Sequence, residues 1–140
     1  LLDYTQREAA WLITQVTDTT KQAVRDALAA GLEAGEGIDG LVKRIRESDA
    51  AFGRARAELI ARTETTRVTN GGQQETHAAW AEAEGVRVTK TWLAVLDSRT
   101  RDEHAALSGT TVEIDATFPN GFKAPGEPNC RCTLIYSVED

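Results

Sequence analysis

The 140-residue chain has only two cysteines, three prolines and no methionine. Two cysteines are too few for the disulfide framework that stabilises many small secreted domains. A bond between Cys130 and Cys132 would close a small, strained ring, because a single residue separates them. The C-x-x-C spacing of redox pairs is also absent. We therefore expect two free thiols in a reducing compartment.

The sequence also lacks long apolar runs and an excess of positive charge. No apolar run approaches membrane-spanning length, and no signal peptide is recognisable. The 22 acidic residues outnumber the 16 basic ones, which gives a net charge of −6 and argues against nucleic-acid binding over the whole surface. Arginines cluster locally, so a basic strip remains open. The missing initiator methionine indicates a fragment of a longer protein.

Three segments of the first half have the apolar spacing of helices: residues 3–16, 17–35 and 37–48. The first places Tyr4, Trp11, Leu12 and Val16 on one side. The second has Asp18 as a candidate N-cap and Gly35 as a stop signal. The third has apolar residues at i, i+3, i+4 and i+7, which predicts a short amphipathic helix.

A longer element with helical spacing runs from Asp49, its candidate cap, to Gly85, and the residues leave open whether it is one continuous helix. One stripe recurs at steps of three and four residues: Phe52, Ala55, Leu59, Thr63, Thr66, Asn70, Gln73, His77 and Trp80. The sequence Asn70-Gly71-Gly72 opposes a continuous helix, since each glycine costs about 1 kcal/mol relative to alanine. The centre of the stripe is polar and must find hydrogen-bond partners if it is buried.

The second half predicts a small sheet. Residues 86–96, 110–114 and 130–138 are rich in β-branched residues, with a short helix predicted in 97–109 and a loop in 115–129. Cys130 and Cys132 would begin the last strand and point to the same face. The fold class is therefore α+β: a helical N-terminal half with one long helix, packed against a C-terminal antiparallel sheet of about three strands.

Candidate chemical residues fall in three places. Glu64 and Arg67 have the spacing of a helical ion pair, or lie on a solvated helix face. Asp97 and His104 could serve acid–base chemistry, although no nucleophile motif accompanies them. Cys130, Cys132 and His104 could bind zinc with Asp97 or Glu127 as a fourth ligand, but the spacing favours reduced, metal-free thiols that simply pack.

Taken in order, three stretches resemble the phage Mu F-like head morphogenesis (minor capsid) proteins: ARTETTRVTN, WLAVLDSRTRDEHAALSGTTV and FPNGFKAPGEPNCRCTL. The likeness covers about residues 55–138, so we predict a helical region at 1–50 and a Mu F-like domain at 51–140. It implies a protein of the head interior that passes through the host cytoplasm during assembly. The implied partners are portal and capsid or scaffold proteins, in support of DNA packaging or ejection, with DNA contact left open and no membrane.

The resemblance implies no established enzyme and no required cofactor, and it favours one continuous helix through Asn70-Gly71-Gly72. Arg101 and Glu127 stand where many relatives have soft metal ligands, so this chain departs from a pattern that suggests a zinc knuckle. We expect a structural network between the long helix and the segment around His104, formed by Arg62, Thr63, Glu64, Arg67, Asn70, Asp97 and Arg99. Two alternatives stay open: a delivery module of a toxin-associated protein, and a metal-dependent hydrolase or nuclease using Asp97, His104 and Glu127.

Overall fold

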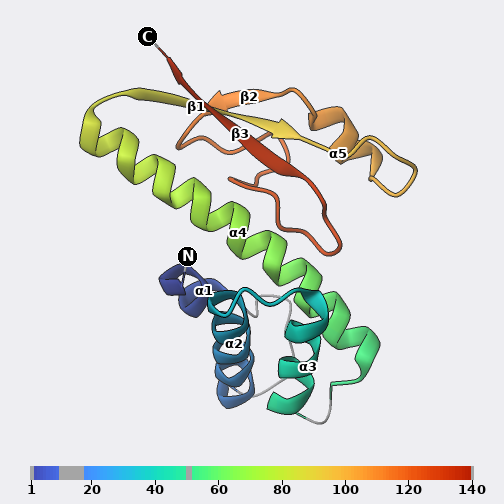
Figure 1. The fold of residues 1–140 in the computed structure, drawn as a ribbon. Helices are drawn as coiled ribbons and strands as arrows, with labels where there is room; N and C mark the ends of the chain where they lie inside the picture. The colour runs from blue at the N-terminus through green and yellow to red at the C-terminus, as the bar shows by residue number, and fades with distance from the viewer. Residues whose placement is uncertain (1, 10–17, 50–51, 140) are drawn as a thin grey trace. The chain divides into compact units, whose positions relative to one another are not determined.

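A computed structural model describes residues 2–9, 18–49 and 52–139 of the chain. The elements follow the order α1 (Leu2–Glu8), α2 (Asp18–Glu33), α3 (Ile38–Ser48), α4 (Arg54–Glu84), β1 (Arg87–Leu93), α5 (Asp102–Leu107), β2 (Thr111–Glu113) and β3 (Thr133–Glu139), so the long helices precede the strands (Figure 1). The predicted α+β class is therefore confirmed. Trp11, Leu12 and Val16 lie outside the described residues.

Packing divides the chain into two compact units that share helix α4. The first unit spans residues 1–69 with 127–129, and the second spans residues 70–126 with 130–140. This division is based on how the residues pack and does not test where a domain begins in the sequence. The domain boundary predicted after residue 50 therefore stays a prediction. None of the described helices is long and apolar enough to cross a membrane.

The core of the first unit joins α2 and α3 to the N-terminal part of α4. Its buried apolar residues are Ala9, Val24, Leu28, Leu41, Val42, Ile45, Phe52, Ala57, Ile60, Ala61 and Val68. Gly31 lets α2 and α3 approach closely, since a Cβ atom there would lie 2.4 Å from Leu41 Cδ2. Gly35 has a φ of +70° and ends α2 with the paired backbone hydrogen bonds of a Schellman motif, which confirms it as the stop signal.

Two expectations for α4 are wrong. Asp49 does not cap this helix; it is the C-cap of α3, where its N–H donates to Ile45 O at 3.3 Å. The predicted stripe also has the wrong phase, because Ala55, Gln73 and Trp80 are exposed. Phe52 precedes the helix and is buried from a non-helical position, so counting from it misplaces the following turns. The buried side of the first turns contains Ala57, Ile60, Ala61, Glu64 and Val68.

Helix α4 continues through Asn70, Gly71 and Gly72, all of which are buried. This confirms the continuity of the helix despite its glycines. The helix ends in a Schellman motif, in which Gly85 has a φ of +64° and Val86 N donates to Ala81 O at 3.1 Å. A left-handed residue at this position is what turns the chain from helix into strand β1.

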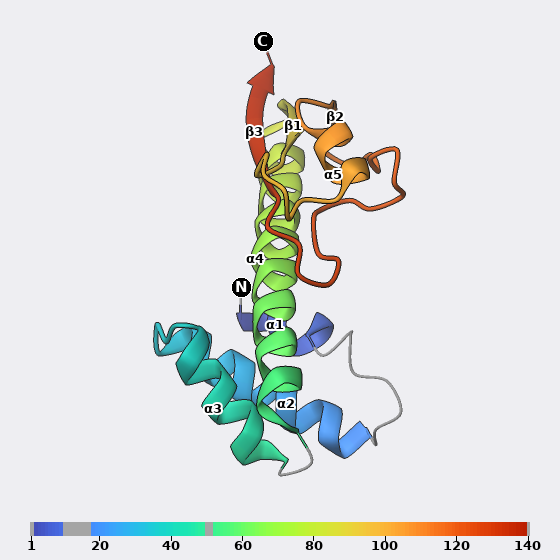
Figure 2. The ribbon, with the colours of Figure 1, turned by 90° about the vertical axis from the view of Figure 1, so that its right-hand side faces the viewer.

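The second unit contains a three-stranded antiparallel sheet, as predicted, and its strand order is β2-β1-β3. The strands lie beside the C-terminal part of α4 (Figure 2). Val88, Lys90 and Trp92 alternate along β1, so they share one face of the sheet, and all three are buried. Trp92 packs with Phe118, Leu107, Leu134 and the two cysteines in one cluster, while Ala81, Val88 and Ile114 form a second.

Candidate functional site

The two cysteines lie in the irregular segment that leads into β3. The strand begins at Thr133, so the expectation that Cys130 and Cys132 begin it is wrong. Just before this segment, Asn129 has a left-handed backbone conformation with a φ of 57°. Within it, the backbone N–H of Cys132 donates to Cys130 Sγ at 3.4 Å. This sulfur contact, rather than strand alternation, holds the two side chains close together.

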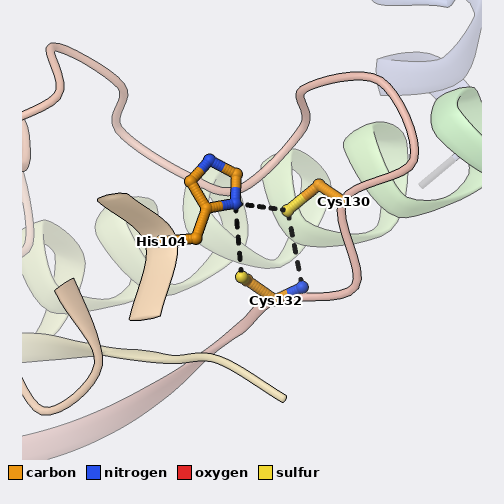
Figure 3. Close-up of side chains that lie close together, drawn as sticks. All are labelled: His104, Cys130 and Cys132. Atoms are coloured by element: carbon orange, nitrogen blue, oxygen red, sulfur yellow. Dashed lines mark hydrogen bonds between the residues drawn. The ribbon is translucent and has the colours of Figure 1, made fainter. Parts of the chain in front are cut away.

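His104 brings an imidazole to both thiols from the short helix α5. Its Nδ1 atom lies 3.7 Å from Cys130 Sγ and 3.7 Å from Cys132 Sγ (Figure 3). All three side chains are buried, and their ligand atoms lie within 4.8 Å of one another. The ring of Trp92 meets the imidazole edge-on, with centroids 5.6 Å apart. The three residues named as a candidate metal set from the sequence are thus brought together.

The apolar surroundings favour the uncharged form of the Cys130 thiol. Burial raises the pKa of Cys130 to about 12, and the neighbouring Cys132 contributes in the same direction, while the backbone N–H of Cys132 opposes it. Without a cation beside it, the Cys130 sulfur is therefore protonated at neutral pH. An S–H group can then donate a weak hydrogen bond to a neutral imidazole nitrogen.

Asp97 is held by an arginine that the sequence analysis missed. The guanidinium of Arg131 binds the carboxylate with two nitrogens, and its Nη1 lies 2.8 Å from Asp97 Oδ2. The backbone N–H of Arg99 also donates to Asp97 Oδ1 at 2.9 Å. These contacts hold the pKa of Asp97 well below its usual range, with the Arg131 hydrogen bonds as the largest cause. Arg131 lies between the two cysteines in sequence, so this ion pair ties their segment to the Asp97 loop.

Buried polar side chains connect α4 to the rest of the second unit. Asn70 Nδ2 donates to Cys132 O at 3.0 Å, and Thr133 Oγ1 donates to Asn70 Oδ1 at 3.2 Å. Gln74 Nε2 donates to Ile114 O at 2.7 Å. Lys90 Nζ donates to Gln74 Oε1 at 3.0 Å and to a backbone carbonyl. The sequence analysis did not predict the burial of Gln74 and Lys90. For Lys90 the reason is that a lysine in an alternating strand sequence normally indicates a solvent-facing position.

The remaining predicted network residues belong to the first unit. Glu64 is completely buried and pairs with Arg67, whose Nε lies 3.1 Å from Glu64 Oε2. Thr63 Oγ1 accepts a hydrogen bond from Asn129 N at 3.1 Å. Arg62 is exposed. The pairing of this part of α4 with Asp97, Arg99 and His104 stays a prediction.

The candidate metal set does not extend to the carboxylates proposed for hydrolysis. Among the described residues, the grouping of potential ligands consists of His104, Cys130 and Cys132, and neither Asp97 nor Glu127 joins it. Asp97 instead serves as the acceptor of an arginine. Two buried thiols and one buried imidazole suit a metal-binding or packing role better than acid–base catalysis, which needs contact with a substrate.

A family model described as "Phage Mu protein F like protein" matches residues 22–135, and so reaches well into the helical region. The chain is 37% identical over 124 residues to "Minor head protein GP7" of Bacillus phage SPP1, covering 81% of this chain and 39% of that protein. It is 32% identical over 132 residues to "NAD(+)--arginine ADP-ribosyltransferase EFV" of Enterococcus faecalis, covering 87% of this chain and 27% of that protein. The chain therefore spans well under half the length of either relative. No solved structure matches it.

Proposed function

Because this chain belongs to the Phage Mu protein F like family, we propose that it acts as a minor head protein of a tailed phage. The observation that carries this proposal is the similarity to a protein named as a minor head protein, which extends over 81% of the chain. The head of the virion is then its location, with the host cytoplasm as its compartment during assembly. Buried free thiols are compatible with a reducing compartment.

Its proposed partners are the portal protein and the capsid or scaffold proteins, and its proposed role is to support head assembly and DNA packaging or ejection. The portal contact belongs to the helical half of the chain in this proposal. The polar side chains described above suit a structural role, since buried hydrogen-bonded networks fix the relative positions of secondary-structure elements. We infer that the chain is not an enzyme.

Co-expression with its neighbouring phage genes tests this proposal. The protein should co-purify with the portal protein or with procapsids, and mass spectrometry should find it in purified heads. A matched preparation from cells without the portal gene shows whether the protein associates with procapsids independently of the portal. Absence from both procapsids and finished heads would contradict a role as a head protein.

A second candidate is a delivery or structural module of a toxin-associated protein. The similarity to a protein named as an ADP-ribosyltransferase raises this candidate, since 87% of this chain matches only 27% of that longer protein, but the higher identity to a minor head protein favours the first candidate. A domain shared between a protein named for the phage head and one named for an enzymatic activity need not itself have the activity. Genes for a toxin and an immunity protein beside this one, in place of portal and capsid genes, would favour the second candidate.

A further inference from the structure

We propose that His104, Cys130 and Cys132 together bind one zinc ion, with the fourth coordination position taken by water or another small donor. Zinc binding at this site does not depend on whether the protein is a head protein. Two separate parts of the second unit supply the donor atoms (Figure 3). Helix α5 supplies the imidazole nitrogen, and the segment before β3 supplies the two sulfur atoms, so that all three lie close together. Nitrogen and sulfur donors are the usual zinc ligands in proteins.

The distances between the donors fit a tetrahedral ion. With Zn–S near 2.3 Å and Zn–N near 2.0–2.1 Å, a tetrahedral angle separates sulfur from nitrogen by about 3.6 Å. Both sulfur atoms lie 3.7 Å from His104 Nδ1. The two sulfur–nitrogen separations therefore already match those around a tetrahedral zinc ion, and the three donor atoms lie within 4.8 Å of one another.

The balance of charge favours zinc at this place. Two thiolates and a neutral imidazole carry a charge of −2, so a divalent ion makes the site neutral, while Cu(I) would leave it negative. The surroundings are apolar, because Trp92, Leu107, Phe118 and Leu134 pack around the cysteines. A neutral centre is the form that such surroundings tolerate best.

Neighbouring residues hold the ligands in place. Cys132 N donates to Cys130 Sγ at 3.4 Å, and Asn70 Nδ2 donates to Cys132 O at 3.0 Å. The ion pair of Arg131 with Asp97 fixes the residue between the two cysteines. Contacts of this kind orient metal ligands and contribute to metal affinity.

Elemental analysis and cobalt substitution test the proposal. The protein, purified without chelator, should contain one zinc per chain. After removal of zinc, titration with Co²⁺ alone should produce thiolate-to-cobalt absorption that saturates at one equivalent and disappears when zinc is added. This absorption is diagnostic because Cys130 and Cys132 are the only cysteines of the chain.

The chain offers a matched control, since His77 is its other histidine. Zinc content and cobalt absorption should be lost in Cys130→Ser and strongly reduced in His104→Gln, whereas His77→Gln should keep both. Circular dichroism identifies any variant that fails to fold, and the cobalt titration of the unmodified chain does not depend on such variants. The proposal is overturned if the unmodified protein contains no zinc and gives no thiolate absorption with cobalt, or if Cys130→Ser retains stoichiometric zinc.

Discussion

Buried charged side chains in this chain have specific polar partners. Glu64 is matched by Arg67 one helical turn away, and Lys90 by Gln74 and a backbone carbonyl. The first pair could be predicted, because residues three apart on a helix are neighbours. The burial of Lys90 and the pairing of Arg131 with Asp97 could not, because both depend on segments far apart in the sequence.

Glu64→Ala should lower the free energy of unfolding by about 1–3 kcal/mol, because it removes the buried carboxylate that pairs with a mostly buried guanidinium. Denaturant titration measures the change. Glu58→Ala is the matched control, since Glu58 forms an exposed pair with Arg54 on the same helix and its loss should cost no more than about 0.5 kcal/mol. Equal effects of the two substitutions would contradict a supporting role for Glu64.

Lys90 should make stability depend on alkaline pH. Burial lowers its pKa to about 8, with Lys123 acting in the same direction and Asp115 in the opposite one. Between this pH and the ordinary lysine pKa of about 10.4, the unfolded chain binds more protons than the folded chain, so the free energy of unfolding rises with pH. Relative to Lys90→Met, the unmodified protein should gain about 1 kcal/mol between about pH 7 and pH 9.

Urea titrations of both proteins at each pH measure this difference. Lys43→Met is the control, because Lys43 is exposed on α3 and its replacement should leave the pH dependence of stability unchanged. A constant difference in stability between the unmodified protein and Lys90→Met across this range would rule out a lowered pKa for Lys90.

At the scale of elements, helix α4 contains two kinds of buried surface. Its first turns bury mainly apolar side chains, which the 3.6-residue period describes, although the stripe counted from Phe52 missed their phase. Around Asn70 and Gln74 the helix instead buries amides that donate to backbone carbonyls. Hydrophobic patterning cannot predict this second surface, since its partners are carbonyl groups that every sequence contains.

Asn70→Ala should therefore destabilise the fold by about 1–3 kcal/mol, because it removes the donor to Cys132 O and leaves buried polar groups without that partner. The midpoint of chemical unfolding, followed by circular dichroism, measures the loss. Gln73→Ala provides the control three residues further along α4, where the side chain is exposed and the expected change lies within about 0.5 kcal/mol. If Asn70→Ala unfolds at the same denaturant concentration as the unmodified chain, the amide contacts do not stabilise the helix against the sheet.

At the scale of the whole molecule, acidic residues outnumber basic ones, and many of the arginines form ion pairs with carboxylates of the same chain. Several guanidinium groups are bound to carboxylates of the same chain: Arg44 to Glu36, Arg54 to Glu58, Arg67 to Glu64, Arg87 to Glu113 and Arg131 to Asp97. The clusters of arginine seen in the sequence are therefore partly neutralised in the fold. The resemblance left contact with packaged DNA open, and this pairing weighs against strong DNA binding by the chain alone.

We accordingly expect the chain to show weak binding to duplex DNA at physiological salt. Its net charge is −6, and binding through phosphates requires concentrated free Lys and Arg, whose contribution falls steeply as salt rises. Fluorescence anisotropy with a labelled duplex, at low and at physiological salt concentration, measures this directly. Tight binding at physiological salt, weakened in an Arg99→Glu variant but not in Arg87→Glu, would contradict the expectation. It would assign the DNA contact to the exposed loop of Arg99 rather than to an arginine already paired within the chain.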